Sequence, residues 1–249
     1  MKPELADRLN QINREFYSTF AASFSETRAS LRELQVILPY IADGARVLDI
    51  GCGNGRAALM LARERRGVRY VGVDSSAEEI SDFKSRIAHE NGIEAQSRVV
   101  DITQPDWTDA LLLPQAGEQV GKGAFDCILL LAVLHHIPGR DMRARIVQQA
   151  RELLAPQGRI VISTWQFMDS QRMRKKMVPW NLIGVDEREL EPGDALLSWK
   201  RGGMGLRYCH WIGEKELRQM AAEANLGIVE TFRAGGREGN LSLYAILSA

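Results

Sequence analysis

Residues 47–62 read VLDIGCGNGRAALMLA, and glycines stand in this stretch at three alternating positions, Gly51, Gly53 and Gly55. The run VLDI predicts a short buried β-strand, and the alanine- and leucine-rich segment up to about residue 66 predicts a helix. Glycine at such a junction permits positive φ and lets a ligand lie against the main chain, while the helix start offers free N–H groups to an anion. A tight turn without a ligand needs one such glycine, so three of them favour a binding loop.

The composition limits the kinds of partner. The chain has 249 residues, 45% of them hydrophobic, and can bury one substantial core. Its 32 basic and 32 acidic residues cancel, so no overall field draws it toward nucleic acid or an anionic membrane. A polyanion would therefore have to bind at a local basic patch. The densest run of basic residues is 172–176 (RMRKK). Its default interpretation is a solvated helix face; local phosphate contact is the alternative.

The termini and the cysteines indicate the compartment. The N-terminal segment MKPELADRLNQINREF is too polar for a signal peptide, and no apolar run approaches 18 residues. Cys52, Cys127 and Cys209 are widely spaced and form no CxxC pair. We therefore expect a cytoplasmic chain with no disulfide framework, no metal site and no membrane partner.

Periodicity gives the order of elements. Apolar residues recur every three or four positions over residues 5–20 and 31–41, which predicts two amphipathic helices before the first strand. Strand-like runs then alternate with helical ones. The further predicted strands are 70–74, 97–102, 125–133, 159–164, 226–232 and 241–247, and the further helices are 77–90, 141–154 and 213–225.

This alternation predicts an α/β fold with a doubly wound, mostly parallel, seven-stranded sheet and N-terminal helices. No helix separates the last two strands, so the last strand should be antiparallel. We expect one domain, 1–249, in four parts. These are an N-terminal helical cap (1–44), a cofactor-binding half (45–165), a substrate-side insertion (166–208), and a C-terminal helix with strands (209–249).

The spacing of the glycines alone leaves two cofactors open. Gly53-x-Gly55-x-x-Ala58 satisfies the loose dinucleotide pattern, and Asp74 lies at about the ~20-residue distance of a ribose-binding acid. However, acids stand at three successive strand ends, Asp49, Asp74 and Asp101. This arrangement resembles the cofactor site of class I S-adenosylmethionine-dependent methyltransferases, which have a Rossmann-like fold.

That resemblance implies a role for each residue toward S-adenosylmethionine. The glycine loop would face the methionyl and ribose portions of the cofactor. Asp74 would accept hydrogen bonds from both ribose hydroxyls, and Asp101 would meet the adenine amino group. The remaining cofactor-binding residues that we assign on this basis are Asp49, Ser75, Ile102, which would pack on the adenine ring, and Leu131.

Four further segments narrow the family. They are FYSTFAASFSETR (16–28), LAVLHHI (131–137), MVPW (177–180) and RYCHWIGEKEL (207–217). Together they resemble the methyltransferases that esterify 5-carboxymethyl groups on the wobble uridine of tRNA, including the domain attached to an AlkB-type oxygenase. The resemblance spans most of the chain and implies tRNA as a partner, with a small zinc-binding activator subunit as a second. The chain departs from the family in its short insertion after the fifth strand and in Asn240-Leu241, where an Asn-Trp strand is usual.

The acceptor chemistry decides which side chains are needed. A carboxylate is ionised at neutral pH and requires no general base, only a group that holds it. Arg28, within Phe24-Ser25-x-Thr27-Arg28, is our candidate for that group, against a surface salt bridge as the alternative. His135 and His136 follow the fourth strand and are the other catalytic candidates. Because adjacent residues point in different directions, we expect one of them to enter the site.

Aromatic and polar residues of the later segments are candidates for substrate binding. Trp165 and Trp180 could stack on an RNA base, although core or lid packing is the common use of tryptophan. Tyr208 and His210 belong to the Arg-Tyr-x-His segment and could line the entrance.

Four functions remain open on these residues. The leading one is methylation of the carboxylate of a 5-carboxymethyl-type wobble uridine in tRNA. The alternative keeps the cofactor but gives the enzyme a small-molecule substrate, as an O- or N-methyltransferase. A non-catalytic cofactor-binding scaffold is third, and an NAD-dependent oxidoreductase is disfavoured because the chain shows no separate substrate domain.

Overall fold

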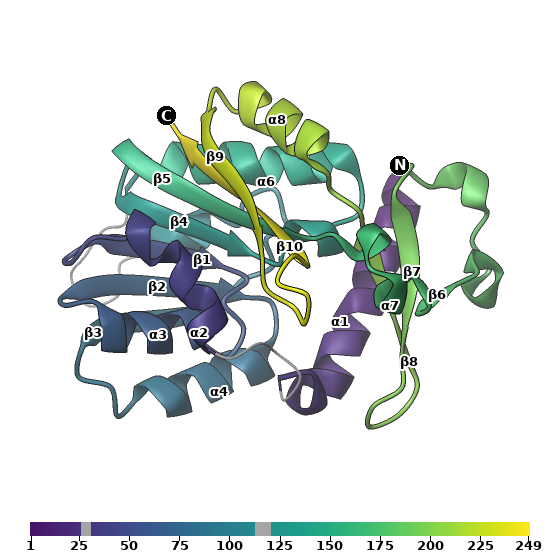
Figure 1. Ribbon diagram of the computed structural model, residues 1–249, viewed down its shortest axis with the longest axis horizontal. Helices are drawn as coiled ribbons and strands as arrows, with labels where there is room; N and C mark the ends of the chain where they lie inside the picture. Colours follow the sequence, from purple (N-terminus) through teal and green to yellow (C-terminus); the bar gives the residue numbers. More distant parts are fainter. Residues whose placement is uncertain (26–30, 113–120) are drawn as a thin grey trace.

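The central sheet has seven strands in the order β3-β2-β1-β4-β5-β10-β9 (Figure 1). This computed structural model describes residues 1–25, 31–112 and 121–249, so Arg28 lies outside the described residues. The strands are β1 Arg46–Ile50, β2 Val68–Asp74, β3 Ile93–Val99, β4 Phe125–Leu131, β5 Leu154–Trp165, β9 Gly227–Ala234 and β10 Ser242–Ser248.

The pairing of these strands confirms the predicted sheet. Strands β1 to β5 pair in parallel, with Leu48 of β1 opposite Val71 of β2 and Ile128 of β4. Strand β10 runs antiparallel to both β5 and β9. Two neighbouring strands that are joined without a crossover helix pair in antiparallel fashion. The lack of a helical pattern between the last two predicted strands therefore predicted the direction of β10.

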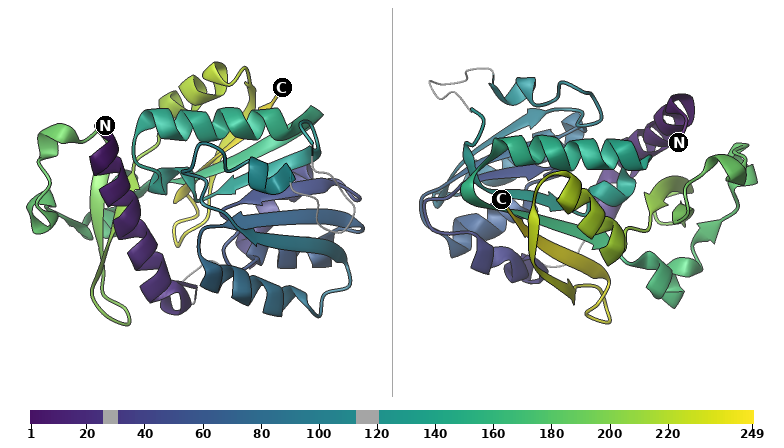
Figure 2. Two further views of the ribbon diagram at one scale, coloured as in Figure 1. Left: turned by 180° about the vertical axis from the view of Figure 1, so that it is seen from behind. Right: turned by 90° about the horizontal axis from the view of Figure 1, so that it is seen from above.

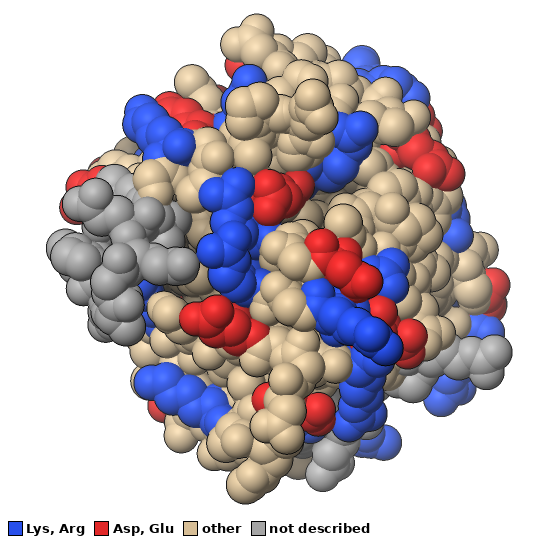
Figure 3. Space-filling view, turned by 90° about the vertical axis from the view of Figure 1, so that its left-hand side faces the viewer, with Lys and Arg blue, Asp and Glu red and all other residues tan. Residues whose placement is uncertain are grey.

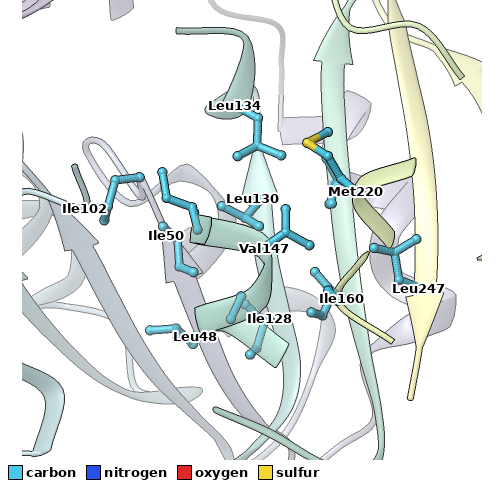
Figure 4. Close-up of a cluster of buried hydrophobic side chains, with 14 of the residues drawn as sticks. Leu48, Ile50, Ile102, Ile128, Leu130, Leu134, Val147, Ile160, Met220 and Leu247 are labelled. Atoms are coloured by element: carbon cyan, nitrogen blue, oxygen red, sulfur yellow. The ribbon is translucent and has the colours of Figure 1, made fainter. Parts of the chain in front are cut away.

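Helices cover both faces of the sheet (Figures 1 and 2). In β1, Leu48 and Ile50 point to one face, which packs on α6 (Arg140–Leu153) and α8 (Glu214–Glu223). Figure 4 shows this cluster, with Val147 of α6 and Met220 of α8 meeting strand residues. Val47 points to the other face, toward α3 (Arg56–Glu64) and α4 (Ala77–Ile87). The period of two along each strand therefore builds two apolar layers around one sheet.

The third strand differs from its prediction. It was expected over residues 97–102, but the structure places it at Ile93–Val99. Its side chains are mostly half-buried and polar because it is an edge strand, so no apolar pattern marks its start. The prediction rested on the apolar residues Val100 and Ile102. In the structure they follow the strand, on either side of Asp101, and pack into the core.

The predicted substrate-side insertion (166–208), for which the sequence predicted no strand, contains most of a second sheet. It has three antiparallel strands in the order β6-β7-β8, formed by Met177–Val178, Asp194–Trp199 and Gly205–His210. Helix α1 (Pro3–Ser25) packs along β8, where Asn13 Oδ1 accepts the N–H of Tyr208 at 2.8 Å. Strand β8 therefore runs across the expected boundary at residue 208.

This small sheet and α1 lie beyond the carboxyl ends of the parallel strands (Figures 1 and 2). The remaining short helices are α2 (Leu31–Leu34), α5 (Asp109–Leu112) and α7 (Gln171–Arg174). No helix among the described residues is long and apolar enough to cross a membrane.

Figure 3 looks at the molecule from the other side, where the parallel strands begin, and shows acidic and basic side chains interspersed. Ion pairs account for part of this mixture: Arg46 contacts Asp126 at 3.1 Å, and Lys122 contacts Glu152 at 2.8 Å. This face therefore carries no patch of a single sign in the part of the chain that the figure colours.

Candidate active site at the carboxyl edge of the sheet

A cavity of about 1220 Å³ lies where the parallel strands end, between the sheet, α1 and the small second sheet. Ligands of open α/β sheets bind at this edge, and the volume exceeds what one drug-sized ligand usually occupies. It brings together residues from all parts of the chain. The residues assigned from sequence that line it are Gly51, Asp74, Ser75, Asp101, Ile102, Leu131, His136 and Trp165.

The glycine loop has the backbone that its sequence predicts. Gly51, Gly53 and Gly55 have φ of 75°, 51° and 79°, in the left-handed region that only glycine enters at little cost. Gly51 lines the cavity, whereas a Cβ built on Gly55 would lie 2.4 Å from Cδ2 of buried Phe83. Gly51 thus presents main chain to the cavity, and Gly55 allows α3 and α4 to approach closely.

Asp74 ties this loop to β2. Its Oδ2 accepts the N–H of Gly53 at 2.9 Å, and its Oδ1 accepts the N–H of Ser76 at 3.0 Å. Because a carboxylate offers about four lone-pair positions, an aspartate placed here can accept from the main chain and from ligand hydroxyls together.

Asp49 lies beneath the loop rather than on the cavity surface. It is buried and accepts a hydrogen bond from the hydroxyl of Tyr70. Burial is the first cause that raises the pKa of Tyr70, and the Asp49 charge adds to it. In the structure, Asp49 therefore supports the strand end from inside and does not line the cavity.

Asp101 and Ile102 form the far end of the cavity. Oδ1 of Asp101 accepts from the N–H and the hydroxyl of Thr103, at 2.9 and 2.7 Å, and Nη1 of Arg14 lies 3.5 Å from its Oδ2. The buried side chain of Ile102 lines the same wall. A carboxylate beside an apolar surface suits a flat base with an exocyclic amino group.

These groups fit the adenosine part of S-adenosylmethionine. The fit rests on the glycine main chain at the end of β1 and on two carboxylates, Asp74 at the end of β2 and Asp101 just after β3. A further feature, not signalled by the sequence, is Ala132, which lines the cavity after β4 with φ of 59°. Its N–H is held by Ser163, 3.0 Å from both the carbonyl oxygen and the hydroxyl.

The two adjacent histidines occupy different environments. His136 lines the cavity, and its Nδ1 lies 3.2 Å from the carbonyl oxygen of Tyr208, which can only accept. This nitrogen therefore carries a proton, and in the neutral ring Nε2 accepts from the hydroxyl of Tyr17 at 2.7 Å. Tyr17 also lines the cavity.

His135 is fully buried and is absent from the cavity wall. Its Nδ1 faces the N–H of Trp165 at 3.4 Å. Burial holds the pKa of His135 well below its usual value of 6.5, and the neighbouring His136, Arg207 and His210 lower it further. In the folded chain it is a neutral packing residue.

Arg207 is the cavity residue that the sequence reasoning missed. Its side chain is buried, lines the cavity, and has its Cζ between three aromatic rings. The distances from Cζ to the ring centroids are 4.7 Å for Trp165, 5.2 Å for Phe16 and 5.8 Å for Trp199. Such stacking stabilises a guanidinium and fixes its plane.

The other substrate candidates lie elsewhere. Trp180 and Tyr208 are buried in a cluster with Leu5 and Leu9 of α1. The hydroxyl of Tyr208 donates to Oδ1 of Asp194 at 2.6 Å. None of Trp180, Tyr208 or His210 lines the cavity.

His210 belongs to a buried ionic network. Its Nδ1 lies 2.6 Å from Asp194 and its Nε2 3.0 Å from Glu216. Glu216 also accepts from Arg143 at 2.8 Å, and Arg143 contacts Glu191 at 2.9 Å. Donor atoms of Glu191, Asp194 and His210 come within 4.8 Å of one another, but these internal partners make the group a structural network that joins the second sheet to α6 and α8.

Charged residues from several elements line the cavity. Asp74, Glu78 and Asp101 belong to the half of the sheet with the glycine loop, as does Arg56. The segment that carries the second sheet contributes charged side chains that are all basic: Arg172, Lys175, Lys176, Lys200, Arg201 and Arg207. Arg14 and Glu15 of α1, together with Glu33 and Arg237, line the cavity as well.

Comparisons with known proteins agree with this geometry. A family model described as a methyltransferase domain matches residues 21–231. The chain is 26% identical over 162 residues to mouse tRNA (carboxymethyluridine(34)-5-O)-methyltransferase ALKBH8, which covers 65% of this chain and 21% of that protein. It is 29% identical over 198 residues to 27-O-demethylrifamycin SV methyltransferase of Amycolatopsis mediterranei, which covers 78% of this chain and 64% of that protein. The chain thus spans less than two thirds of the length of each.

Solved structures share the fold. An S-adenosylmethionine-dependent methyltransferase from Methanosarcina mazei superposes with a TM-score of 0.64 at 22% identity, covering 85% of this chain and 95% of that one. A structure from Haloferax volcanii, a complex between the Trm112 methyltransferase activator and a methyltransferase, gives a TM-score of 0.61 at 14% identity and covers 96% and 97%. The chain therefore belongs to the methyltransferase domain family, and its fold is that of S-adenosylmethionine-dependent methyltransferases.

Proposed function

We propose that this enzyme methylates the carboxylate of a 5-carboxymethyl-type uridine at the wobble position of tRNA. The observation that carries the proposal is Arg207, a buried cation on the acceptor side of the cavity. A guanidinium held between aromatic rings presents a rigid fork that matches a carboxylate. The mouse relative named above, which acts on carboxymethyluridine, supports the same acceptor.

On this proposal the strand ends hold the cofactor. Asp74, with Ser75 beside it, accepts the ribose hydroxyls, and Asp101 accepts the adenine amino group. Gly51 and Leu131 lie against the methionyl and ribose portions, and Ile102 packs on the adenine ring. When bound, S-adenosylmethionine supplies an electrophilic methyl group.

The remaining residues position the acceptor. Its carboxylate is already ionised, so the protein only orients it and excludes water. Arg207 holds one carboxylate oxygen, with the other directed at the methyl group, and Trp165 offers a face for the uracil ring. Arg28 remains our candidate for a second cation, from the segment shared with the tRNA-modifying family.

The test uses labelled cofactor and total tRNA, from the host and from a strain that lacks the gene. We expect label only in tRNA from the deletion strain, and mild alkali should release it because the product is an ester. The assay is run with and without a co-expressed Trm112-type activator, which we propose as a partner on the strength of the Haloferax complex. Alkali-stable label, or no label in either arm, contradicts the proposed acceptor.

A small-molecule hydroxyl is the second candidate acceptor. The Tyr17–His136 pair favours it, because an imidazole with its proton on Nδ1 can take the tyrosine proton at Nε2 while the tyrosine takes that of the acceptor. The Amycolatopsis relative acts on a small molecule by its name. A Tyr17→Phe variant separates the two: it removes activity if a hydroxyl is the nucleophile and preserves the methylation of a carboxylate.

A further inference from the structure

Four of the basic side chains that line the cavity, Arg172, Lys175, Lys176 and Lys200, form what we call the cationic rim. Arg172 lies in α7, and Lys175 and Lys176 form the turn between α7 and β6. Lys200 begins the turn between β7 and β8. Three of the four are exposed, and Lys176 is half-buried.

The rim lacks carboxylate partners in the part of the chain that the structure describes. Within residues 1–25, 31–112 and 121–249, none of the four forms a salt bridge, whereas basic residues elsewhere commonly do. Examples are Lys122 with Glu152 and Arg218 with Glu214. In a chain of zero net charge, cations gathered without counter-charges mark a place where an external anion binds.

Neighbouring positive charges repel the ammonium group of Lys176. Burial is the largest cause that lowers its pKa from the usual 10.5, and the positive charges of Arg207 and Arg172 lower it further. An arriving anion would relieve this repulsion. The Lys176 ammonium also lies 5.5 Å from the centroid of the Trp199 ring, so its position is defined.

Hydrogen bonds and close packing hold the segments that carry the rim. The carbonyl oxygen of Lys176 accepts from the N–H of Ser198 at 2.8 Å and from its hydroxyl at 3.0 Å, which joins β6 to β7. The indole N–H of Trp199 donates to the carbonyl oxygen of Arg201 at 2.6 Å. Gly205 packs so closely on Phe20 of α1 that a Cβ there would lie 2.4 Å from its ring.

We propose that the cationic rim binds the phosphates of the RNA nucleotides that flank the target base, while the base itself enters the cavity. This inference rests on the proposed function in taking RNA as the acceptor. A single small anion would be satisfied by Arg207 inside the cavity. Four more cations, from α7, the turn between α7 and β6, and the turn between β7 and β8, suit a chain of phosphates.

The test compares two double variants of the full chain. Lys175→Gln with Lys200→Gln removes two charges from the rim, and Lys122→Gln with Lys215→Gln removes two exposed charges elsewhere. Binding of fluorescent tRNA in the presence of S-adenosylhomocysteine is measured over a series of salt concentrations. The rim variant should bind more weakly, and its plot of log affinity against log salt should be shallower by about 0.7 for each phosphate that the variant no longer neutralises.

The controls separate this inference from the proposed function. The Lys122/Lys215 variant should match the wild type, and calorimetry should give the rim variant an unchanged affinity for S-adenosylhomocysteine. Ester formation on tRNA together with an unchanged slope in the rim variant overturns the rim and leaves the function standing. A reduced salt slope in the rim variant, without ester formation on tRNA by the wild type, supports the rim and overturns the proposed function. A wild-type enzyme that binds no tRNA overturns the rim whatever the acceptor.

Discussion

At the scale of single residues, position along a strand decided which side chains reach the cavity. The segment RYCH lies in β8, where alternate side chains point to opposite faces. Arg207 faces the cavity, whereas Tyr208 packs on Leu5 and Leu9 of α1, and His210 meets Asp194 of β7 and Glu216 of α8. Tyr208 and His210 were candidates for the substrate entrance because they belong to the Arg-Tyr-x-His segment. Once the segment is assigned to a strand, alternation shows that Arg207 cannot share a face with them.

Arg207 can be tested by a substitution that keeps its charge. Arg207→Lys should lower kcat/KM for tRNA by about 10- to 100-fold, since it loses one charge-assisted hydrogen bond of about 1.5–3 kcal/mol and the planar fork. Steady-state kinetics measure this, with Arg46→Lys on the opposite face as the matched control. Affinity for S-adenosylhomocysteine reports on folding and should stay unchanged. An Arg207→Lys enzyme with wild-type kcat/KM would rule out the proposed carboxylate grip.

At the scale of elements, regular periodic segments were predictable and short irregular ones were not. The glycine loop, the helix after it and the reversal at β10 all followed from local pattern. The second sheet did not, because β6 has only two residues and the burial of β7 and β8 does not alternate regularly between apolar and polar positions. Their pairing joins residues 177–178 to 196–197 across long turns, and no local periodicity encodes such a contact.

The glycine loop offers a matched pair of substitutions. Gly55 and Gly44 have nearly equal φ, 79° and 72°, but a Cβ meets Phe83 at Gly55 and nothing within 4 Å at Gly44. Gly44→Ala should cost about 1–2 kcal/mol of unfolding free energy, from backbone strain alone. Gly55→Ala should cost about 1–3 kcal/mol more, from overpacking. Urea denaturation measures both, and equal losses would mean that close helix packing does not require the glycine.

At the scale of the whole molecule, the buried network around His210 joins the small second sheet to α6 and α8, the helices that cover the central sheet. Its members come from β7, β8, α6 and α8, and from the segment before β7. Burial alone would lower the pKa of His210, but the hydrogen bonds to Asp194 and Glu216 outweigh it and raise the pKa above 6.5. The positive charge of Arg143 opposes this rise. No sequence motif predicts this network, because its residues are far apart along the chain and come into contact only in the folded protein.

Stability should therefore depend on pH through His210. Because its pKa is higher in the folded than in the unfolded chain, its contribution is complete below pH 6.5 and disappears as the pH rises through the raised value. The difference in unfolding free energy between wild type and His210→Gln should be larger at about pH 6 than at about pH 9. Denaturant titrations at both pH values test this, with exposed His89→Gln as the control. A pH-independent difference would show that the folded chain does not hold the His210 proton more tightly.

The account depends most on the cofactor lying at the strand ends with its ribose on Asp74. Titration of S-adenosylhomocysteine in a calorimeter, into wild type and Asp74→Asn, tests this directly, with Asp126→Asn at the opposite edge as the control. We expect binding by the wild type and the control, and about 10- to 100-fold weaker binding by Asp74→Asn, from the loss of charge-assisted hydrogen bonds. Equal affinity in all three proteins would contradict this placement of the cofactor.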